Sequence, residues 1–413
     1  MRTLSGISAV AQVRKIAARS SRFDDVEPRV QRILDDVRKN GDRALRKYAR
    51  QWDGLGAKDS LKVPEREIRA AWKAASPKLR ASLRQAAANV RQFCEWQKPK
   101  EWRRKKAGIS LGVLVRPLDS VGCYIPAGRY PLVSTMLMTV IPAQVAGVKN
   151  IRVTSPRPSS EVLAAAGMLG VREFYRVGGA QAIAALAYGT ETVSRVDKIV
   201  GPGNLYVTAA KKLVSFDCSI DMLAGPTEVV VVSENGEPEL IASDLVAQAE
   251  HDPEAISIFI TTSRKLADAV AESVKELASD NAIAQQSLKK SGIILLAKSS
   301  RQALDWANQI APEHITVEKS TVPFIHNAGS VFVGDYSPQA GGDYASGPNH
   351  VLPTAGAARF RGGLSVMDFV KLITVQELSR SGLGRIASTI TYLAKTEGLR
   401  AHAESIRLRC GNA

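Results

Sequence analysis

The chain of 413 residues is 45% hydrophobic and 23% charged, a composition typical of a globular protein with two or more domains. It has no run of about 18 apolar residues and no apolar segment after its first charges, so we expect neither a membrane span nor a signal peptide. Its four cysteines lie far apart without a C-x-x-C pair, which argues against a disulfide scaffold or cysteine-rich zinc site and favours the cytoplasm.

The net charge of +16 belongs entirely to the first quarter of the chain. Residues 1–110 hold 28 of the 56 Lys and Arg but only 12 of the 40 Asp and Glu, so residues 111–413 hold 28 of each sign. The basic residues accompany apolar residues at helical spacing, which predicts exposed faces of amphipathic helices. Such charge can attract nucleic acid, but no RNA-binding aromatic motif or zinc finger accompanies it. We interpret it as a solvated surface that also draws in anionic cofactors.

The first quarter is predicted to be helical, and the rest to alternate between strands and helices until about residue 364. Amphipathic stretches at about 25–50 and 65–99 predict helices, and 98–108 is interpreted as a charged turn. Next, β-rich runs alternate with helical stretches of about 10–15 residues, which predicts βαβ units and a parallel sheet. After about 364 the chain is predicted to be helical again. The predicted strands are 110–117, 120–126, 150–156, 198–201, 228–233, 256–262, 292–297 and 330–335.

A nucleotide-binding fingerprint is incomplete in this sequence. The segment GPGNLY (201–206) begins like G-x-G-x-x-G, but Tyr206 stands where the third glycine is required. No clear acidic residue follows on a second strand about 20 positions later. The spacing alone therefore does not establish dinucleotide binding.

One of the five histidines lies near the end of a predicted helix in a pattern that suits a metal. Gln248 precedes His251 by three residues in DLVAQAEH, so both side chains share one helix face. An imidazole and an amide oxygen on one face can hold a borderline-soft metal such as zinc, although Gln is an uncommon ligand. A polar helix end is the alternative interpretation.

A second pattern places a carboxylate next to an imidazole. Glu313 and His314 stand at a helix-to-strand junction in IAPEHITV, where both can border one cleft. Together they offer two proton acceptors, which suits a reaction with two different deprotonations. A surface pair is the alternative.

The remaining histidines have weaker local signals. His350 and Asp343 share a Gly-rich loop, GGDYASGPNHVLPT, which on its own is also compatible with a plain turn. His402 follows Glu397 by five residues near the carboxyl terminus, and His326 has no obvious partner.

Taken together and in this order, these segments resemble the histidinol dehydrogenase family from about residue 20 to the end of the chain. His251, His314 and His350 lie within the strongest matching stretches. The strongest matching stretches are IPAQVAGVKNIRV, RVGGAQAIAALAYGTETV, VDKIVGPGNLYVTAAKK, IDMLAGPTEVVVV, DLVAQAEHDPEA, IAPEHITV, GDYASGPNHVLPT and GGLSVMDFVK.

The resemblance implies a set of site residues. The zinc ligands of that family correspond to Gln248, His251, Asp343 and His402, and its acid/base pair to Glu313 and His314. Its NAD-binding positions correspond to Tyr124, Gln181 and Asn204. Its substrate contacts correspond to Thr227, Gln248, His251, His314, Asp343, His350, Glu397 and His402.

The resemblance also implies the reaction, the last steps of histidine biosynthesis. L-histidinol is oxidised through L-histidinal to L-histidine, with one hydride passing to NAD in each of two steps. His314 is expected to take the hydroxyl proton in the first step, and Glu313 to activate water in the second. No cysteine nucleophile is required, so Cys123 is expected to serve packing.

The implied architecture is α/β, with two incomplete Rossmann-like domains and small helical end pieces. The expected pieces are 1–20 at the amino terminus, a discontinuous domain of 21–122 plus 229–363, and a second domain of 123–228. Residues 364–413 are expected to cross to a partner subunit. The resemblance therefore implies a homodimer with shared active sites, which brings His402 to the zinc.

Three positions depart from the family pattern, and one related enzyme remains as an alternative. Thr227 replaces the usual Ser and keeps its hydroxyl, Ala127 replaces a Gly near the cofactor, and Pro348 stiffens the loop before His350. The segment GRYPL also resembles a sister group that oxidises sulfopropanediol. A sulfonate pocket favours a basic residue over Glu397, so the histidinol branch is preferred. A nucleic-acid-binding protein that uses the basic helices is the alternative of another class.

Overall fold

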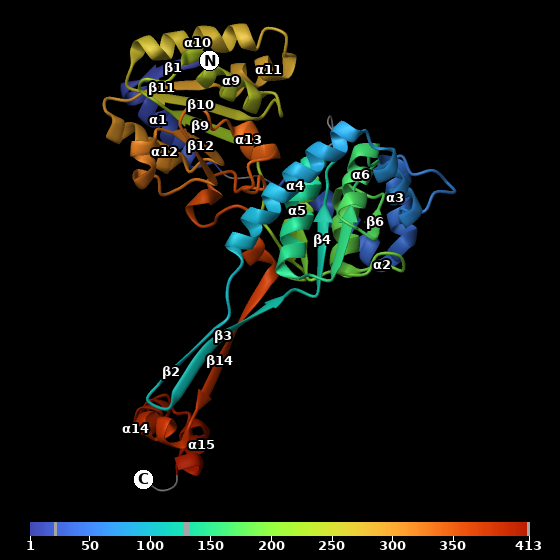
Figure 1. Cartoon of the computed structure of the whole chain (residues 1–413), viewed down its shortest axis with the longest axis vertical. Helices are drawn as coiled ribbons and strands as arrows, with labels where there is room; N and C mark the ends of the chain where they lie inside the picture. The colour runs from blue at the N-terminus through green and yellow to red at the C-terminus, as the bar shows by residue number, and fades with distance from the viewer. Residues whose placement is uncertain (20–22, 128–131, 411–413) are drawn as a thin grey trace.

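Two parallel sheets and one antiparallel ribbon organise the chain (Figure 1). The structure is a computed structural model that describes residues 1–19, 23–127 and 132–410. Each parallel sheet belongs to its own α/β domain, and the ribbon extends away from both as an arm. The predicted α/β class is therefore confirmed.

The first domain to be completed along the chain is built on a five-stranded parallel sheet with the order β6-β5-β4-β7-β8. Helices from the first quarter of the chain pack against the helices that cover this sheet: α3 packs on α6, α2 on α7 and α8, and α4 on α5. The strands are β4 (Ser120–Tyr124), β5 (Asn150–Thr154), β6 (Glu173–Tyr175), β7 (Lys198–Val200) and β8 (Ser219–Ile220). The helices are α2 (Glu27–Trp52), α3 (Glu65–Ala74), α4 (Pro77–Gln97), α5 (Val133–Ala146), α6 (Ser160–Met168), α7 (Gly179–Tyr188) and α8 (Leu205–Val214).

The other domain is built on a six-stranded parallel sheet with the order β1-β11-β10-β9-β12-β13. Its strands are β1 (Arg2–Ser5), β9 (Glu228–Val232), β10 (Ile256–Thr261), β11 (Ile293–Leu296), β12 (His314–Val317) and β13 (Ser330–Val333). Its helices are α1 (Gly6–Ala17), α9 (Pro238–Ala249), α10 (Arg264–Leu277), α11 (Ala282–Ser291), α12 (Ser300–Ile310) and α13 (Gln339–Tyr344). Short 3-10 turns are η1 (Lys319–Phe324) and η2 (Ala357–Arg359).

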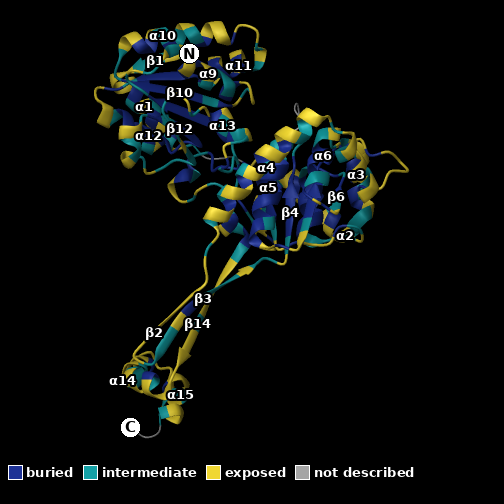
Figure 2. Ribbon diagram, viewed as in Figure 1, coloured by how far each residue is buried: buried dark blue, intermediate teal, exposed yellow. Residues whose placement is uncertain are grey.

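The strand β9 continues after Glu228 as a run of four valines, and their packing explains this run. Val230 and Val232 pack with α1 and α12 on one face of the sheet, whereas Val229 and Val231 pack with α9 and α10 on the other. Successive side chains of a strand point to opposite faces, so a sheet covered on both sides selects apolar residues at every position. Figure 2 shows the resulting buried strands beneath exposed helices.

The division into domains differs from the predicted one. The helices within 27–97 pack on the five-stranded domain, so 21–122 does not join 229–363. Residues 1–19 are not a separate helical piece, because β1 pairs with β11 and α1 packs on α12. An amphipathic pattern shows that a helix has an apolar face but not which sheet that face covers. The chain therefore passes between the domains after α1, after β8 and again before residue 366.

The arm is a three-stranded antiparallel sheet that ends in two helices. It consists of β2 (Trp102–Lys106), β3 (Ile109–Pro117) and β14 (Val370–Leu378), which follows η3 (Val366–Phe369), then α14 (Arg380–Thr396) and α15 (Arg400–Cys410). Figure 1 shows α14 and α15 at its far end. Figure 2 shows that most of the arm is exposed.

Two sequence predictions for this region were wrong. Residues 102–106 form a strand rather than part of a charged turn, because Ala107 and Gly108, both with positive φ, fold it back onto β3. Residues 370–378 also form a strand rather than a helix, since they pair with β3 along its full length. Both segments lack a core of their own, so only their pairing with β3 selects the extended form.

Among the helices of the described residues, none combines the length and the apolar composition that a membrane span requires.

Candidate active site

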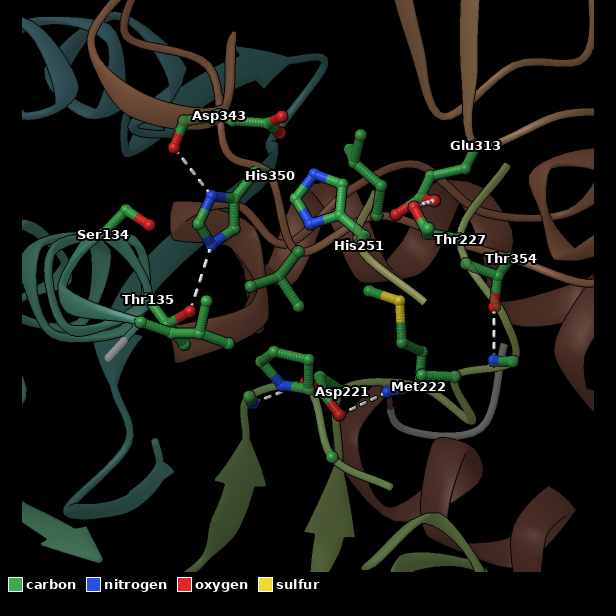
Figure 3. A pocket seen from close by; sticks show the side chains of 18 of the residues that line it. Ser134, Thr135, Asp221, Met222, Thr227, His251, Glu313, Asp343, His350 and Thr354 are labelled. Atoms are coloured by element: carbon green, nitrogen blue, oxygen red, sulfur yellow. Dashed lines mark hydrogen bonds between the residues drawn. The ribbon is translucent and has the colours of Figure 1, made fainter. Parts of the chain in front are cut away.

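Seven of the predicted site residues line one cavity of about 210 Å³ between the two domains. The five-stranded domain contributes the carboxyl ends of β7 and β8 and the first turn of α5. The six-stranded domain contributes the starts of β9 and β12, the end of α9, and α13. Figure 3 shows these side chains converging from both domains. The seven residues are Thr227, Gln248, His251, Glu313, His314, Asp343 and His350.

Three of the four predicted zinc ligands lie in this cavity. Gln248 and His251 come from the carboxyl end of α9, and Asp343 comes from α13. The amide nitrogen of Gln248 donates to Thr227 Oγ1, so its amide oxygen is the atom available to a metal. In the view of Figure 3, the His251 ring lies between His350 and Glu313. One chain thus supplies one nitrogen and two oxygen donors, which suit zinc.

Glu313 is a buried carboxyl group held by two donors. It is 7% exposed, and its Oε2 accepts from Thr227 Oγ1 at 2.5 Å and from the Glu228 backbone N–H at 2.9 Å. Burial raises the pKa of Glu313 to about 7, although His314 and these two donors oppose the shift. A carboxyl group that titrates near neutral pH suits a general base.

His314 occupies the first position of β12 and is 3% exposed. Its Nδ1 lies 3.2 Å from the Glu228 carbonyl oxygen, which can only accept, so Nδ1 carries a proton. Its Nε2 lies 3.7 Å from Asp343 Oδ1. Burial lowers the pKa of His314, but the carboxylates of Glu313 and Asp343 and the Glu228 carbonyl raise it to about 9 overall.

His350 is fixed on the opposite wall of the cavity. Its Nδ1 donates to the Asp343 backbone oxygen at 2.8 Å, and its Nε2 lies 3.4 Å from Thr135 Oγ1 (Figure 3). Burial lowers the pKa of His350 despite the nearby Asp343 carboxylate. A neutral imidazole anchored in this way suits a substrate contact.

A second cavity, of about 330 Å³, gathers the three predicted NAD-binding residues. Tyr124 ends β4 and its hydroxyl accepts from the Gly179 N–H at 3.1 Å, while Gln181 donates to Asp53 at 3.1 Å. Asn204 caps the start of α8. The amino ends of α7 and α8 both face this cavity, which also has Arg29 and Arg157 in its wall. Helix amino ends and arginines favour an anionic ligand.

Glu397 and His402 are the predicted residues that the structure does not bring to either cavity. Glu397 follows α14 and His402 lies in α15, both exposed on the arm. Figure 1 shows these helices far from the two domains of the same chain. Within the described residues of one chain, no cluster of three His, Cys, Asp or Glu is arranged to hold a metal.

Sequence reasoning assigned no role to a buried ion pair in the cavity wall. Lys211 and Asp221 are 2% and 4% exposed, and their side chains contact each other directly. Lys211 also donates to the Gly201 carbonyl at 3.0 Å, and Asp221 accepts from the Gly201 N–H at 2.7 Å. The only sequence signal is their place beside the matched GPGNLY and IDMLAGPTE motifs. This pair fixes the loop after β7. That loop contributes to the walls of both cavities.

Cys123 is excluded as a nucleophile by its surroundings. It lies inside β4 with no exposed surface, and burial raises the pKa of its thiol to about 12. The thiolate is the reactive form, so this residue is inert at neutral pH. The expected packing role agrees with its place in the core.

Comparison with known proteins decides the family. A family model described as histidinol dehydrogenase matches residues 16–410. The chain belongs to the histidinol dehydrogenase family. The histidinol dehydrogenase of Methanothermobacter thermautotrophicus is 48% identical over 402 residues, which are 94% of each chain. That of Methanosarcina barkeri is 45% identical over 99% of this chain and 97% of the relative.

A solved structure supports the same conclusion for the fold. The crystal structure of histidinol dehydrogenase from Elizabethkingia anophelis matches with a TM-score of 0.94 and 35% identity. The match covers 99% of this chain and 98% of that one. The resemblance noted in the sequence is therefore confirmed, and the chain is an oxidoreductase of the histidinol dehydrogenase family. These comparisons favour neither the sulfopropanediol nor the nucleic-acid alternative.

Proposed function

We propose that the protein oxidises L-histidinol through L-histidinal to L-histidine, reduces two NAD and uses one zinc ion per site. The observation that carries this proposal is the interdomain cavity that holds Glu313 and His314 beside Gln248, His251 and Asp343. The second cavity, which includes Tyr124, Gln181 and Asn204, is where we place NAD. The family assignment supports both placements.

The donor set supports zinc as the metal. The nitrogen of His251 and the oxygens of Gln248 and Asp343 face one cavity, and His402 of a partner's arm would be the fourth ligand. Bound zinc would orient the amino alcohol through its nitrogens, and its charge would offset the Asp343 carboxylate that raises the pKa of His314.

In the first half-reaction, His314 acts as the base. Its Nδ1–H is held by the Glu228 carbonyl, which leaves Nε2 to face the cavity and accept the proton of the substrate hydroxyl. Loss of this proton accompanies hydride transfer from the carbinol carbon to the nicotinamide. The products of this step are the aldehyde and NADH.

In the second half-reaction, Glu313 acts as the base. Its buried carboxylate takes a proton from water as the water oxygen adds to the aldehyde carbon, while His314 returns to the aldehyde oxygen the proton it took in the first step, which gives a hydrate. The hydrate then gives a hydroxyl proton to His314 and its hydride to a second NAD, which yields the carboxylic acid, and this acid loses its proton to solvent to become the carboxylate of histidine. Both bases line the same cavity, so the aldehyde need not leave between steps.

We propose that the active protein is a homodimer. Glu397 and His402 lie on an exposed arm, and no residue of this arm lines the cavity of its own chain. The family pattern nevertheless places both residues at the site. The arm of a partner chain can bring them to the cavity, so that each site contains residues from two chains.

One assay tests this function. Purified protein is incubated with L-histidinol and NAD before chelation, after chelation and after zinc is restored, and NADH is counted per substrate consumed. We expect about two NADH per histidinol, with activity lost to the chelator and regained with zinc. A folded, zinc-loaded dimer that makes no NADH from histidinol would contradict the proposal, and sulfopropanediol would then be the first alternative substrate.

A further inference from the structure

Glu228, whose backbone contacts Glu313 and His314, forms a buried ion pair with Arg19. Arg19 Nε donates to Glu228 Oε1 at 2.7 Å, and Arg19 Nη2 contacts Glu228 Oε2, so the two side chains form a bidentate pair. The two side chains are 14% and 3% exposed. A bidentate Arg–carboxylate pair fixes both position and direction of the carboxylate.

The backbone of Glu228 holds both candidate catalytic side chains. Its N–H donates to Glu313 Oε2 at 2.9 Å, and its carbonyl oxygen accepts from His314 Nδ1 at 3.2 Å. These two groups belong to the peptide groups on either side of the Glu228 Cα, so a change in the backbone angles of Glu228 would misplace the Glu313 carboxylate and release the imidazole proton together. No other described residue bonds to both side chains.

The ion pair also joins the three connections between the domains. Arg19 follows α1 at the start of the first connection, Glu228 follows the second, and Glu228 Oε1 accepts from the Ala355 N–H of the third at 2.9 Å. Arg19 Nη1 donates to the carbonyls of Ile16 and Ile310, each at 2.8 Å. The position of Glu228 is thus set by contacts from distant parts of the chain.

We propose that Arg19 and Glu228 are positioning residues for Glu313 and His314, an inference that rests on the proposed function. The pair fixes the backbone of Glu228, whose N–H orients Glu313 and whose carbonyl keeps the proton of His314 on Nδ1. Groups that orient a catalytic imidazole through its second nitrogen act in this way in many active sites. Neither Arg19 nor Glu228 lines the interdomain cavity, so neither touches substrate.

The test uses Arg19→Lys, which keeps the charge but loses the fork, and Glu228→Gln, which keeps the size and an acceptor for Ala355. The control is Arg152→Lys in the Arg152–Glu173 pair on β5 and β6 (Nε–Oε2 2.9 Å), in which the Arg side chain is 11% exposed, close to Arg19, and the Glu side chain is 29% exposed. We expect kcat with histidinol to fall about 10–100-fold in Arg19→Lys and less in Glu228→Gln. The KM for NAD should stay within about twofold of the wild type, since NAD is placed in the other cavity.

A second readout separates positioning from simple destabilisation. In metal-free protein labelled with ¹⁵N-histidine, the Nδ1–H of His314 should give a slowly exchanging signal, because it is buried against a carbonyl. The signal is assigned by its loss in His314→Gln. The signal should broaden by exchange in Arg19→Lys. It should persist in Arg152→Lys, provided that the two variants have matched melting temperatures.

Either of two results would overturn the proposal: an unchanged His314 signal in Arg19→Lys, or equal losses of kcat in Arg19→Lys and Arg152→Lys. If Arg19→Lys fails to fold, Glu228→Gln carries both measurements. If the wild type does not oxidise histidinol, the proposed function fails, while the ¹⁵N signal still decides whether the pair positions His314.

Discussion

At the scale of single residues, burial gives the cavity its chemistry. Glu313 and His314 are adjacent in the chain, yet their pKa values are shifted upward by different causes: burial dominates for Glu313, and neighbouring carboxylates overcome burial for His314. Thr227 links Glu313 to the candidate ligand Gln248 through two hydrogen bonds. The Thr in place of the family's Ser keeps these bonds because they need only a hydroxyl.

Substitution of Glu313 should separate the two oxidation steps. In Glu313→Gln, the amide oxygen can still accept from Thr227 and Glu228, but the side chain cannot take a proton from water. We expect oxidation of histidinal to slow about 10²–10⁴-fold while the first hydride transfer continues. Single-turnover measurements should give about one NADH per site instead of two. Two NADH formed at the wild-type rate would contradict this role.

The pH dependence of the second step should follow Glu313. Burial raises the pKa of this carboxyl to about 7, and the base is active only when it is deprotonated. The rate of histidinal oxidation should therefore rise with pH through about 7 and fall about tenfold per pH unit below it. Stopped-flow rates with histidinal and saturating NAD would measure this. A profile that is flat from pH 5 to 8, or one that persists in Glu313→Gln, would contradict the assignment.

At the scale of elements, charged pairs and turns determine how loops and strands are held. The loop after β7 is fixed by Lys211 and Asp221, which together bond to both backbone groups of Gly201. Gly201 has a φ of +113°, and a Cβ there would clash with the Tyr124 carbonyl oxygen, so the loop depends on glycine at this point.

Breaking the Lys211–Asp221 pair should be costly because it leaves a buried charge. Lys211→Met should lower the free energy of unfolding by about 3–5 kcal/mol, and the double variant with Asp221→Asn should lose less than the sum of the single variants. Urea unfolding would measure both. Arg69→Ala in the exposed Arg69–Glu65 pair of α3 is the control and should cost about 1 kcal/mol or less. Equal costs in the buried and exposed pairs would show that burial does not matter here.

The turn between β2 and β3 offers a test of the arm alone. Gly108 has a φ of +81°, and a Cβ there would lie 2.9 Å from the Gly382 backbone at the start of α14. Gly108→Val should therefore displace the arm's helices without altering either domain. We expect activity to fall at least tenfold while the main unfolding transition of the domains stays within a few degrees. Gly384→Ala, at a position with open space, is the control. Wild-type activity in Gly108→Val would show that the arm's geometry is not needed.

At the scale of the whole molecule, one chain supplies two domains and an arm that does not touch its own cavity. The interdomain cavity needs both sheets, because its walls come from the carboxyl ends of β7 and β8 and from the starts of β9 and β12. The arm carries the two remaining candidate residues away from it (Figure 1).

Hybrid dimers test whether a site is shared between chains. His314→Ala and His402→Ala should each be inactive as homodimers. If His402 serves the partner's cavity, a mixed dimer contains one intact site out of two. Since half of the dimers in a refolded equimolar mixture are mixed, activity should return to about a quarter of the wild type. If His402 served its own chain, the mixed dimer would hold no intact site and activity would not return.

The sequence by itself determined the α/β class, most strand positions and the family. Alternating apolar strands and helices carry local periodicity, and motifs such as Q-A-E-H and A-P-E-H keep site residues within a few positions of each other. Glu313 and His314, or Gln248 and His251, could therefore be identified as pairs from these local motifs alone. The outer strands of the arm, β2 and β14, could not. The extended form of β14 depends on pairing with β3 across about 250 to 270 positions of the chain, as for Ile109 and Leu378.

Only the tertiary structure decided which sheet the first-quarter helices cover and which ion pair lies next to the candidate catalytic residues Glu313 and His314. An apolar helix face specifies burial but not a partner. Arg19 and Glu228 meet across 209 positions, and no local pattern marks either residue as paired. Contacts of this kind form only when the segments that connect the domains come together, so they are present only in the folded chain.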